Sequence, residues 1–488
     1  MAKSINDEYL QQVIKLGDEG SELLAKICAP TLRANSDVRI IGPENRVALK
    51  VPDDYRVFVH STTGEHYDSC EKTAESLVSR LFDQALAIGA APVAMTNIID
   101  SSTGDTDLLR KIAEPMAKKA GDIGVAIING ENAILGDIVR GNFNISGTMI
   151  SIAPKSAKVH GNELPDEGTF DFNGNQYAHF YPIGQYVIAN SDGIGTKIRF
   201  YQRNNRWFPS LNDFLAMILD DQAKIRGVTA KVASGVIECE DLRNAQIGEC
   251  QNHMGIRCGQ MGILGTLQPG IGQLREYKEG IDAYNIGGTA VGVVSEEDLE
   301  HPLAPVPGDA VIAIKGRPNP RSNGISDKRK RMIQLFGQNW HETEVGKIFL
   351  EYLAEPSTVF YPLFKDMIDH NLATGVFHMS GGAYNGKFAR PLAKNKLFAR
   401  IENLFAPDWR ELTLIGSAFD SAETAYAKYH MGNEGFITTG SLTTALEFIE
   451  KQGLHARVVG SVYDAGTVGK TGLELRAFNG DTVYFSGK

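Results

Sequence analysis

The chain has 488 residues, 42% hydrophobic and 22% charged, which is enough apolar material for about three globular domains. Its formal net charge of −10 argues against a nucleic-acid-binding surface, which would need a basic face. No apolar run approaches the roughly 18 residues that span a bilayer, and residues 1–8 lead into an amphipathic segment rather than a signal-peptide core. We therefore expect a cytoplasmic protein without nucleic-acid or membrane partners.

The five cysteines are an odd number in a large chain, which does not suggest a disulfide framework. Cys239, Cys250 and Cys258 lie near His253, within an insertion at about 238–280 that the patterns do not assign. Their spacing lacks the paired C-x-x-C knuckles of a zinc site, so we expect reduced, partly buried thiols.

The chain contains an internal repeat, because two pairs of matching segments occur in the same order along it. Residues 83–91 match residues 221–229, each with Asp-Gln at the end of an apolar helical pattern. Residues 143–148 match residues 284–289, and each segment opens a strand-like run. Each copy is predicted to contain a strand, a motif loop, a strand, the Asp-Gln helix, a strand, a second helix and a final strand.

The repeat divides the chain into four segments. We predict a first copy at 1–155, an exposed linker at 156–167, a second copy at 168–303 and a different α/β domain at 304–488. Within the last domain, the patterns predict a strand over 310–314 and helices over 326–336 and 344–370.

The second copy contains a strand-like run, residues 187–191, that begins with three apolar residues and is followed by Asp192-Gly193-Ile194-Gly195-Thr196-Lys197. Glycines allow backbone N–H groups to approach phosphate oxygens, a lysine adds positive charge, and an aspartate can hold the magnesium of a nucleotide. Taken alone, the segment could also be a tight turn between two strands.

Together with other motifs, this segment resembles the aminoimidazole ribonucleotide (AIR) synthetase family, the phosphoribosylformylglycinamidine cyclo-ligases of purine biosynthesis. The family's D-G-x-G-T-K motif resembles residues 192–197. The family's G-G-E-T-A motif resembles residues 129–133, its N-D-x-x-x-x-G motif residues 221–227, and its Y-D-V-A-G motif residues 284–288. Its P-H-S-N-G-Y-S motif resembles residues 320–326, its T-G-G-G motif residues 380–383, and its F-N-M-G motif residues 429–432.

The resemblance implies two tandem N-terminal-type α/β half-barrel domains that pair within the chain, followed by a C-terminal α/β domain, an overall α+β and α/β fold class. This intrachain pseudo-dimer is compatible with a further homodimer. The resemblance also implies ATP and Mg²⁺ as cofactors. The nucleotide-binding residues would be Asp192, Gly193, Gly195, Thr196, Lys197, Glu131 and Asn132, the metal ligands Asp192, Asp220 and Asp221, and the catalytic residues Lys197, Asp192, Asp221 and His378.

The two copies have lost complementary parts of the family's site. In the first copy the phosphate motif has decayed to residues 60–67, without the Asp and the Lys, but Glu131 and Asn132 remain. In the second copy residues 265–268 lack the glutamate. We predict one composite nucleotide site with residues from both copies. The alternative is that the first copy only completes the sheet as a structural partner.

Loops of the last domain are expected to bind a phosphorylated small-molecule substrate. Arg321 stands where the family has a histidine, and a guanidinium holds a phosphate or carboxylate but does not shuttle protons near neutrality. The substrate-binding residues implied by the resemblance are Arg321, Ser322, Asn323, Gly324, Ser380, Gly381, Gly382 and His430.

The implied reaction is ATP-dependent cyclisation of formylglycinamidine ribonucleotide to aminoimidazole ribonucleotide, a ligase reaction in which phosphoryl transfer activates an amide oxygen. Two alternatives stay open. One is another ATP-dependent enzyme of the superfamily that phosphorylates a different carbonyl, carboxamide or phosphate acceptor. The other is a non-catalytic nucleotide-binding protein.

Overall fold

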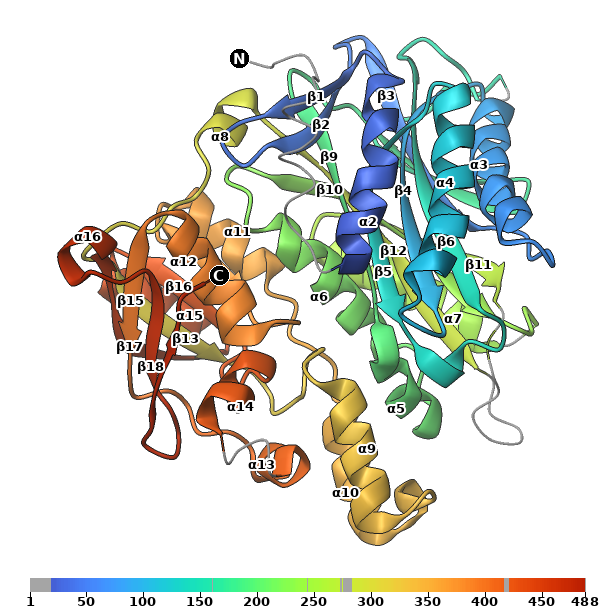
Figure 1. Ribbon diagram of the computed structural model, residues 1–488. Helices are drawn as coiled ribbons and strands as arrows, with labels where there is room; N and C mark the ends of the chain where they lie inside the picture. Colours follow the sequence, from blue (N-terminus) through green and yellow to red (C-terminus); the bar gives the residue numbers. More distant parts are fainter. Residues whose placement is uncertain are drawn as a thin grey trace. The chain divides into compact units, whose positions relative to one another are not determined.

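The computed structural model describes residues 19–159, 161–243, 245–272, 274, 283–416 and 421–487. The fold is mixed α/β, and the described residues form three sheets (Figure 1). Its described residues form two compact units: unit 1 lies within Met1–Ile198 and Ile225–Pro302, and unit 2 within Arg199–Lys224 and Leu303–Lys488. Residues 1–18 of the amphipathic N-terminal segment lie outside the described part of the chain.

Unit 1 contains two six-stranded sheets. The first has the order β7-β8-β3-β6-β4-β5, and the second has the order β1-β2-β9-β12-β10-β11. The strands are β1 (Val38–Ile41), β2 (Arg46–Lys50), β3 (Tyr55–Thr63), β4 (Ala91–Ser101), β5 (Ala126–Ile134), β6 (Phe143–Pro154), β7 (Gly168–Phe172), β8 (Asn175–Phe180), β9 (Tyr186–Gly193), β10 (Thr229–Cys239), β11 (Leu264–Ile271) and β12 (Tyr284–Val294).

Both sheets have the same topology. β3 and β9 pair antiparallel with β6 and β12, and β4 and β10 pair parallel with β5 and β11. The hairpins are exchanged, however: β1–β2, which precedes β3, pairs with β9, and β7–β8, which precedes β9, pairs with β3. The domain boundaries drawn from the sequence stay a prediction, and this exchange means that neither sheet is made from one predicted copy alone.

The helices of unit 1 cover the sheets. In Figure 1, α3 and α4 lie side by side against the sheet that contains β4 and β6, and they share a buried apolar core with it. α7 packs against β11 and fills much of the insertion that the sequence left unassigned. The helices are α2 (Glu19–Cys28), η1 (Ala29–Arg33), α3 (Cys70–Ala87), α4 (Thr106–Asp122), η2 (Gly136–Ile138), η3 (Gly195–Lys197), α7 (Ala245–Gln260) and α8 (Glu296–Glu300).

The two sheets pack face to face. An apolar cluster joins them, with Val57, Val59 and Ile150 from one sheet and Val187, Val232 and Val291 from the other. A buried hydroxyl layer continues the contact: Ser61 Oγ lies 2.7 Å from Ser234 Oγ, and Thr96 Oγ1 lies 2.6 Å from Thr289 Oγ1. Burial of apolar area holds the sheets together, and the hydroxyl pairs fix their register.

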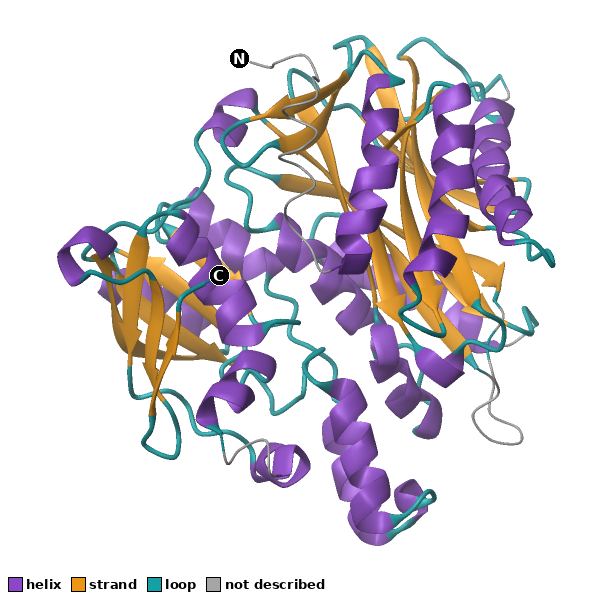
Figure 2. Ribbon diagram, in the orientation of Figure 1, coloured by secondary structure: helices purple, strands orange, loops and turns teal. Residues whose placement is uncertain are grey.

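Unit 2 is built on a seven-stranded sheet of order β14-β16-β13-β17-β15-β18-β19. Its strands are β13 (Ala310–Lys315), β14 (Gly375–His378), β15 (Leu397–Ile401), β16 (Gly435–Thr439), β17 (His455–Asp464), β18 (Gly472–Arg476) and β19 (Thr482–Phe485). Figure 2 shows the strands in orange among the purple helices. The helices are α5 (Ile198–Arg203, whose first residue belongs to unit 1), α6 (Ser210–Gln222), α9 (Ile325–Phe336), η4 (Trp340–Glu342), α10 (Glu344–Leu353), α11 (Tyr361–Asp369), η5 (Tyr384–Ala389), α12 (Arg390–Lys394), α13 (Trp409–Ile415), α14 (Ala422–Lys428), α15 (Leu442–Lys451) and α16 (Ala465–Val468).

The predicted strand over 310–314 and helix over 326–336 are confirmed as β13 and α9. The single helix predicted over 344–370 is wrong, because α10 ends at Leu353 and α11 begins at Tyr361. Pro356 explains the break, since it lacks the N–H that a helix interior needs and restricts the residue before it. No described helix is long and apolar enough to cross a membrane.

The contact between the sheets gives a test. Thr96 and Thr289 are both fully buried. Thr96→Val should lower the free energy of unfolding by about 1–3 kcal/mol because it leaves the Thr289 hydroxyl without its partner. The double variant Thr96→Val/Thr289→Val should recover most of the loss, since both hydroxyls are then gone. Urea unfolding measures both values, and additive losses would contradict the pairing.

Candidate nucleotide and substrate sites

The nucleotide motif begins at the end of β9. Asp192 accepts a hydrogen bond from its neighbour Gly193, with 2.7 Å between Oδ1 and N. Gly195 has a φ of +67°, so the chain turns there into η3 in a conformation that residues with a Cβ rarely adopt. Asp192, Gly195 and Thr196 are partly exposed, whereas Lys197 is buried. The turn therefore presents backbone and carboxylate groups at one edge of unit 1.

β5, which carries the glutamate loop of the first copy, lies beside β9 and η3. Asn129 Oδ1 accepts hydrogen bonds from the backbone N of Ser191 at 2.9 Å and from its Oγ at 2.7 Å. Glu131 and Asn132 follow on β5, and both are partly exposed. The structure thus brings the retained parts of the two copies next to each other, while their roles in binding stay a prediction.

The pseudo-equivalent region has a different content. In the strand registers, Thr62 takes the place of Asp192, and Gln268 takes the place of Glu131. The Gln268 side chain is engaged by the β7–β8 hairpin: its Oε1 accepts from Gln176 N at 3.1 Å, and its Nε2 donates to Gly174 O at 2.9 Å. This region has no carboxylate at either motif position.

Sequence reasoning missed a pair of buried carboxyls in unit 1. Asp100 on β4 pairs in register with Asn144, and Glu238 on β10 pairs in the same way with Asn285. Asn285 Nδ2 donates to Asp100 Oδ2 at 2.7 Å and also hydrogen-bonds Glu238. Burial raises the pKa of Asp100 to about 7 and that of Glu238 to about 8, and each carboxylate's charge works against ionisation of a neighbour. No short motif marks these acids, because only the packing of the sheets brings them together.

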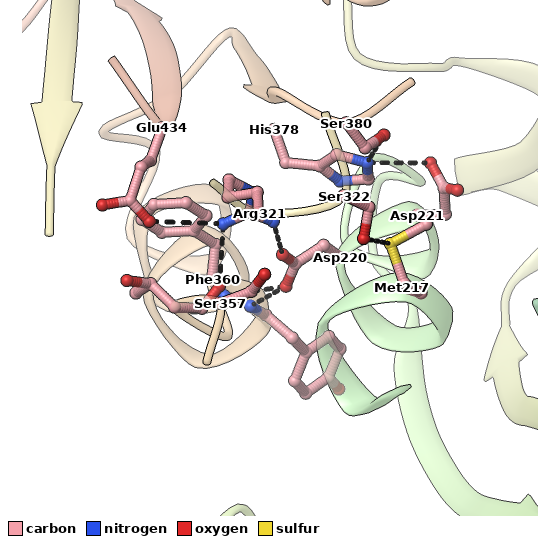
Figure 3. A network of polar contacts seen from close by, with 12 residues as sticks. Met217, Asp220, Asp221, Arg321, Ser322, Ser357, Phe360, His378, Ser380 and Glu434 are labelled. Atoms are coloured by element: carbon pink, nitrogen blue, oxygen red, sulfur yellow. Dashed lines mark hydrogen bonds and ion pairs between the residues drawn. The ribbon is translucent and has the colours of Figure 1, made fainter. Parts of the chain in front are cut away.

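In unit 2, α6 presents two consecutive acids to different surroundings (Figure 3). Asp220 is fully buried. Its Oδ1 accepts from the backbone N–H groups of Phe360 at 2.7 Å and Tyr361 at 2.9 Å, and its Oδ2 accepts from Arg321 Nη2 at 3.0 Å. The prediction that Asp220 binds a metal does not fit these contacts, because both oxygens already bind internal donors.

Arg321 is also buried, with 1% of its surface exposed. Its Nη1 donates to Thr358 O at 2.9 Å and lies 3.7 Å from Glu434 Oε2, and its guanidinium lies 5.0 Å from the centre of the Phe360 ring. The proposed contact of Arg321 with substrate stays untested. Through these internal partners, however, Arg321 holds the loop that follows β13 in place.

Asp221 faces His378 in Figure 3, and two lysines also lie close to it. It forms an ion pair with Lys224, its Oδ1 lies 3.8 Å from Lys387 Nζ, and it lies 3.7 Å from His378 Nε2. Burial would raise the pKa of Asp221, but Lys224, Lys387 and His378 together hold it well below its usual value. Burial likewise lowers the pKa of Lys224 to about 8. Lys224 and Lys387 were missed because no sequence motif marks them.

The glycine turn after β14 adjoins this group. His378 is buried, its Nε2 lies 2.9 Å from Ser380 Oγ, and burial followed by the nearby lysine charges lowers its pKa well below the usual range. Asn323 Nδ2 donates to Ser380 O at 2.7 Å and so ties the two predicted substrate loops together. Gly382 has a φ of +83°, and η5 begins two residues later. The backbone amides of this turn therefore follow His378, the last residue of β14.

Three other predicted substrate residues contact residues of the protein itself. Both ring nitrogens of His430 are engaged, with Nε2 2.8 Å from Asn319 O and Nδ1 accepting from Gly432 N at 3.1 Å. Gly324 has a φ of +60°, and a Cβ there would lie 2.1 Å from the Tyr429 ring. Ser322 Oγ lies 3.3 Å from Met217 Sδ. His430 and Gly324 thus shape the loop, and direct substrate contact by these residues stays a prediction.

Comparison with known proteins relates the chain to a family. A family model described as AIR synthase related protein, N-terminal domain, matches residues 43–153, within the copy whose phosphate motif has decayed. A phosphoribosylformylglycinamidine cyclo-ligase from Thermococcus kodakarensis is 26% identical over 228 residues, covering 44% of this chain and 66% of that protein. One from Methanococcus maripaludis is 24% identical over 305 residues, covering 60% of this chain and 83% of that protein. Among solved structures, T. maritima PurL complexed with AMPPCP is 14% identical with a TM-score of 0.38, covering 61% of this chain and 43% of that chain.

The ion pair of Asp220 gives a second test. Arg321→Met should lower the free energy of unfolding by about 3 kcal/mol at pH 8, because it leaves a buried carboxylate without its cation. The pKa of Asp220, already raised by burial to about 7, should rise further. The folded variant then binds a proton that the unfolded chain does not, so its stability falls as pH rises, and the loss should be smaller at pH 6.

Urea unfolding at both pH values measures this loss. Adding Asp220→Asn to Arg321→Met should restore much of the stability, since the amide oxygen can still accept from Phe360 and Tyr361 N–H. A loss that is equal at pH 6 and pH 8 would show that the missing charge is not its cause.

Proposed function

We propose that this chain, which belongs to the AIR synthetase family, is an ATP-dependent enzyme that cyclises formylglycinamidine ribonucleotide to aminoimidazole ribonucleotide. The observation that carries the proposal is the D-G-I-G-T-K turn of the second copy beside the glutamate strand of the first. The names of the curated relatives support the cyclo-ligase reaction. The direct test is ADP release with this substrate, together with detection of the imidazole product.

The chemistry needs charge neutralisation and positioning more than a protein nucleophile. Transfer of the ATP γ-phosphoryl group to the amide oxygen converts it into a phosphate leaving group, which an internal nitrogen then displaces to close the ring. We assign to Gly193 and Gly195 the approach of backbone amides to the polyphosphate, and to Lys197 its charge. Such a site needs in-line geometry, which a rigid turn between β9 and η3 can supply.

Mg²⁺ fits Asp192, because this ion commonly takes one or two carboxylates together with nucleotide phosphates and water. When bound, it would neutralise charge on the transferred phosphoryl group. Asp221 is surrounded by lysines, a setting that suits an anion better than a metal. We therefore assign Asp221 to holding Lys224 and Lys387 in place, and we leave Asp220 out of the metal site.

We assign the substrate's phosphate to the basic group of unit 2. Lys224 and Lys387 bring two positive charges to one carboxylate, so the group has positive charge left for an anion. The side chains of both lysines are about a quarter exposed, at 24% and 27%. The amides of Gly381 and Gly382 are suitable further donors. His378 would act there in its neutral form, as a donor or acceptor of one hydrogen bond.

The shared strand order of the two sheets supports the further proposal that unit 1 is an intrachain version of two paired half-barrels. Another homodimer contact is compatible with this arrangement. A second candidate function is ATP-dependent phosphorylation of a different acceptor, and it is favoured by one observation: Arg321 replaces the family's histidine and is buried. Turnover of ATP without imidazole formation would support it.

The nucleotide motif gives the first functional prediction. Lys197→Ala and Asp192→Asn should each weaken Mg-ATP binding or turnover at least tenfold, about 1.4 kcal/mol, because each removes a charge assigned to the polyphosphate or its metal. Lys158→Ala is a matched control, since this lysine is about half exposed and pairs with Glu163. Calorimetric titration and ADP release measure the effects, and unchanged values in both variants would overturn the site.

The composite site predicts one nucleotide per chain. Glu131→Ala should impair ATP turnover although Glu131 lies in the copy without the lysine motif. Gln268→Ala, at the pseudo-equivalent position, should leave turnover unchanged and lower only the stability, because it removes bonds to the β7–β8 hairpin. Two bound nucleotides, or a fully active Glu131→Ala enzyme, would leave the first copy as a structural partner only.

A further inference from the structure

Asp100, Glu238 and Asn285 form a polar group inside unit 1 that the proposed reaction does not use. Asp100 and Glu238 occupy equivalent positions near the ends of β4 and β10, one from each repeat. Asn285, on β12, donates to Asp100 at 2.7 Å and hydrogen-bonds Glu238 as well. The three side chains are 4%, 2% and 2% exposed, so water contributes little to their solvation.

The group has more acceptors than donors. Glu238 Oε2 and Asn285 Oδ1 are both buried and have no hydrogen-bond partner. The charge that acts on Asp100 is that of Asp192, and the charge that acts on Glu238 is that of Asp100; both are acidic, and no basic side chain contributes. Buried acceptors without donors are costly, and buried carboxylates are normally paired or bound to a metal. A bound cation or a shared proton would offset this excess of acceptors.

We propose that Asp100, Glu238 and Asn285 bind a divalent cation of the oxygen-preferring class, Mg²⁺ or Mn²⁺, independently of the nucleotide. Two carboxylates and an amide oxygen are the ligand types that this class favours. A flip of the Asn285 amide, whose nitrogen and oxygen are not distinguished by shape, would turn the orphan oxygen toward the ion. No three His, Cys, Asp or Glu side chains in the described chain form a metal cage, so water would complete the coordination.

Such an ion would join the two repeats. Asp100 comes from the sheet that contains β4, and Glu238 and Asn285 come from the sheet that contains β10 and β12. A bound cation would replace repulsion between two carboxylates by a shared ligand contact. The ion would lie near Asp192, because the charge of Asp192 acts on Asp100. The competing explanation is that the carboxyls share a proton and bind no metal.

The test uses the nucleotide-free, full-length protein, stripped with chelator and titrated with Mn²⁺ while free Mn²⁺ is followed by electron paramagnetic resonance. One saturable Mn²⁺ per chain is expected, and Glu238→Gln should weaken it at least tenfold. Asp192→Asn should retain it, because that acid belongs to the nucleotide motif. Glu240→Gln is the matched control, since Glu240 lies two residues along and pairs with Arg140 at the surface.

Thermal unfolding gives a second measure of Mn²⁺ binding. Mn²⁺ should raise the Tm of the wild type and of Asp192→Asn but not of Glu238→Gln, and Asp100→Asn is the second variant if Glu238→Gln does not fold. Absence of a saturable site in the wild type, or unchanged affinity in Glu238→Gln, would leave the proton-sharing explanation. Loss of binding in Asp192→Asn would assign the ion to the nucleotide motif. Any of these results overturns the proposal.

Discussion

The face-to-face packing of the two sheets in unit 1 is the constraint on which the rest depends. The hairpin β1–β2 precedes β3 in the chain but pairs with β9 of the other sheet, and the hairpin β7–β8 precedes β9 but pairs with β3. An edge strand must be paired or covered, and here one repeat covers the edge of the other. Because both sheets are incomplete alone, the repeats cannot separate without exposing strand edges and the apolar cluster between them. The chain gains a fixed internal pairing from which asymmetric sites can be built.

Joining two repeats in one chain removes the symmetry that an assembly of identical subunits would impose. Equivalent positions can then diverge. Glu131 stays beside the nucleotide motif, while its counterpart Gln268 fastens a hairpin. Asp192 keeps its carboxylate, while its counterpart is Thr62. Asp100 and Glu238, by contrast, are acidic residues at equivalent positions of the two repeats. Retention of two mutually repelling groups is hard to explain by packing alone, since hydrophobic residues of similar size would fit a core better.

Local patterns could predict the elements whose signals are local. The periodicity of α4 and α9, and the glycine turn at Gly195, are set by neighbours in sequence. The hairpin exchange could not be predicted, because a strand edge has no side-chain signal for which sheet it will join. Lys387 could not be predicted for a similar reason: it is far from Asp221 in sequence, and only the folding of unit 2 brings it there. Lys224 is three residues from Asp221, but no motif marked the pair. Arg321 was assigned by motif position to substrate, whereas burial gave it an internal partner.

The consecutive acids Asp220 and Asp221 of α6 have different partners. Successive helical residues point about 100° apart, so Asp220 and Asp221 cannot face the same partner. Asp220 turns to Arg321 and the start of α11, where three donors hold it. Asp221 turns to the lysines and His378. The first acid fixes α6 against Arg321 and the start of α11 within unit 2, and this anchoring sets the direction of the second. A substitution at Asp220 would therefore act on Asp221 through orientation, although the two side chains do not share a ligand.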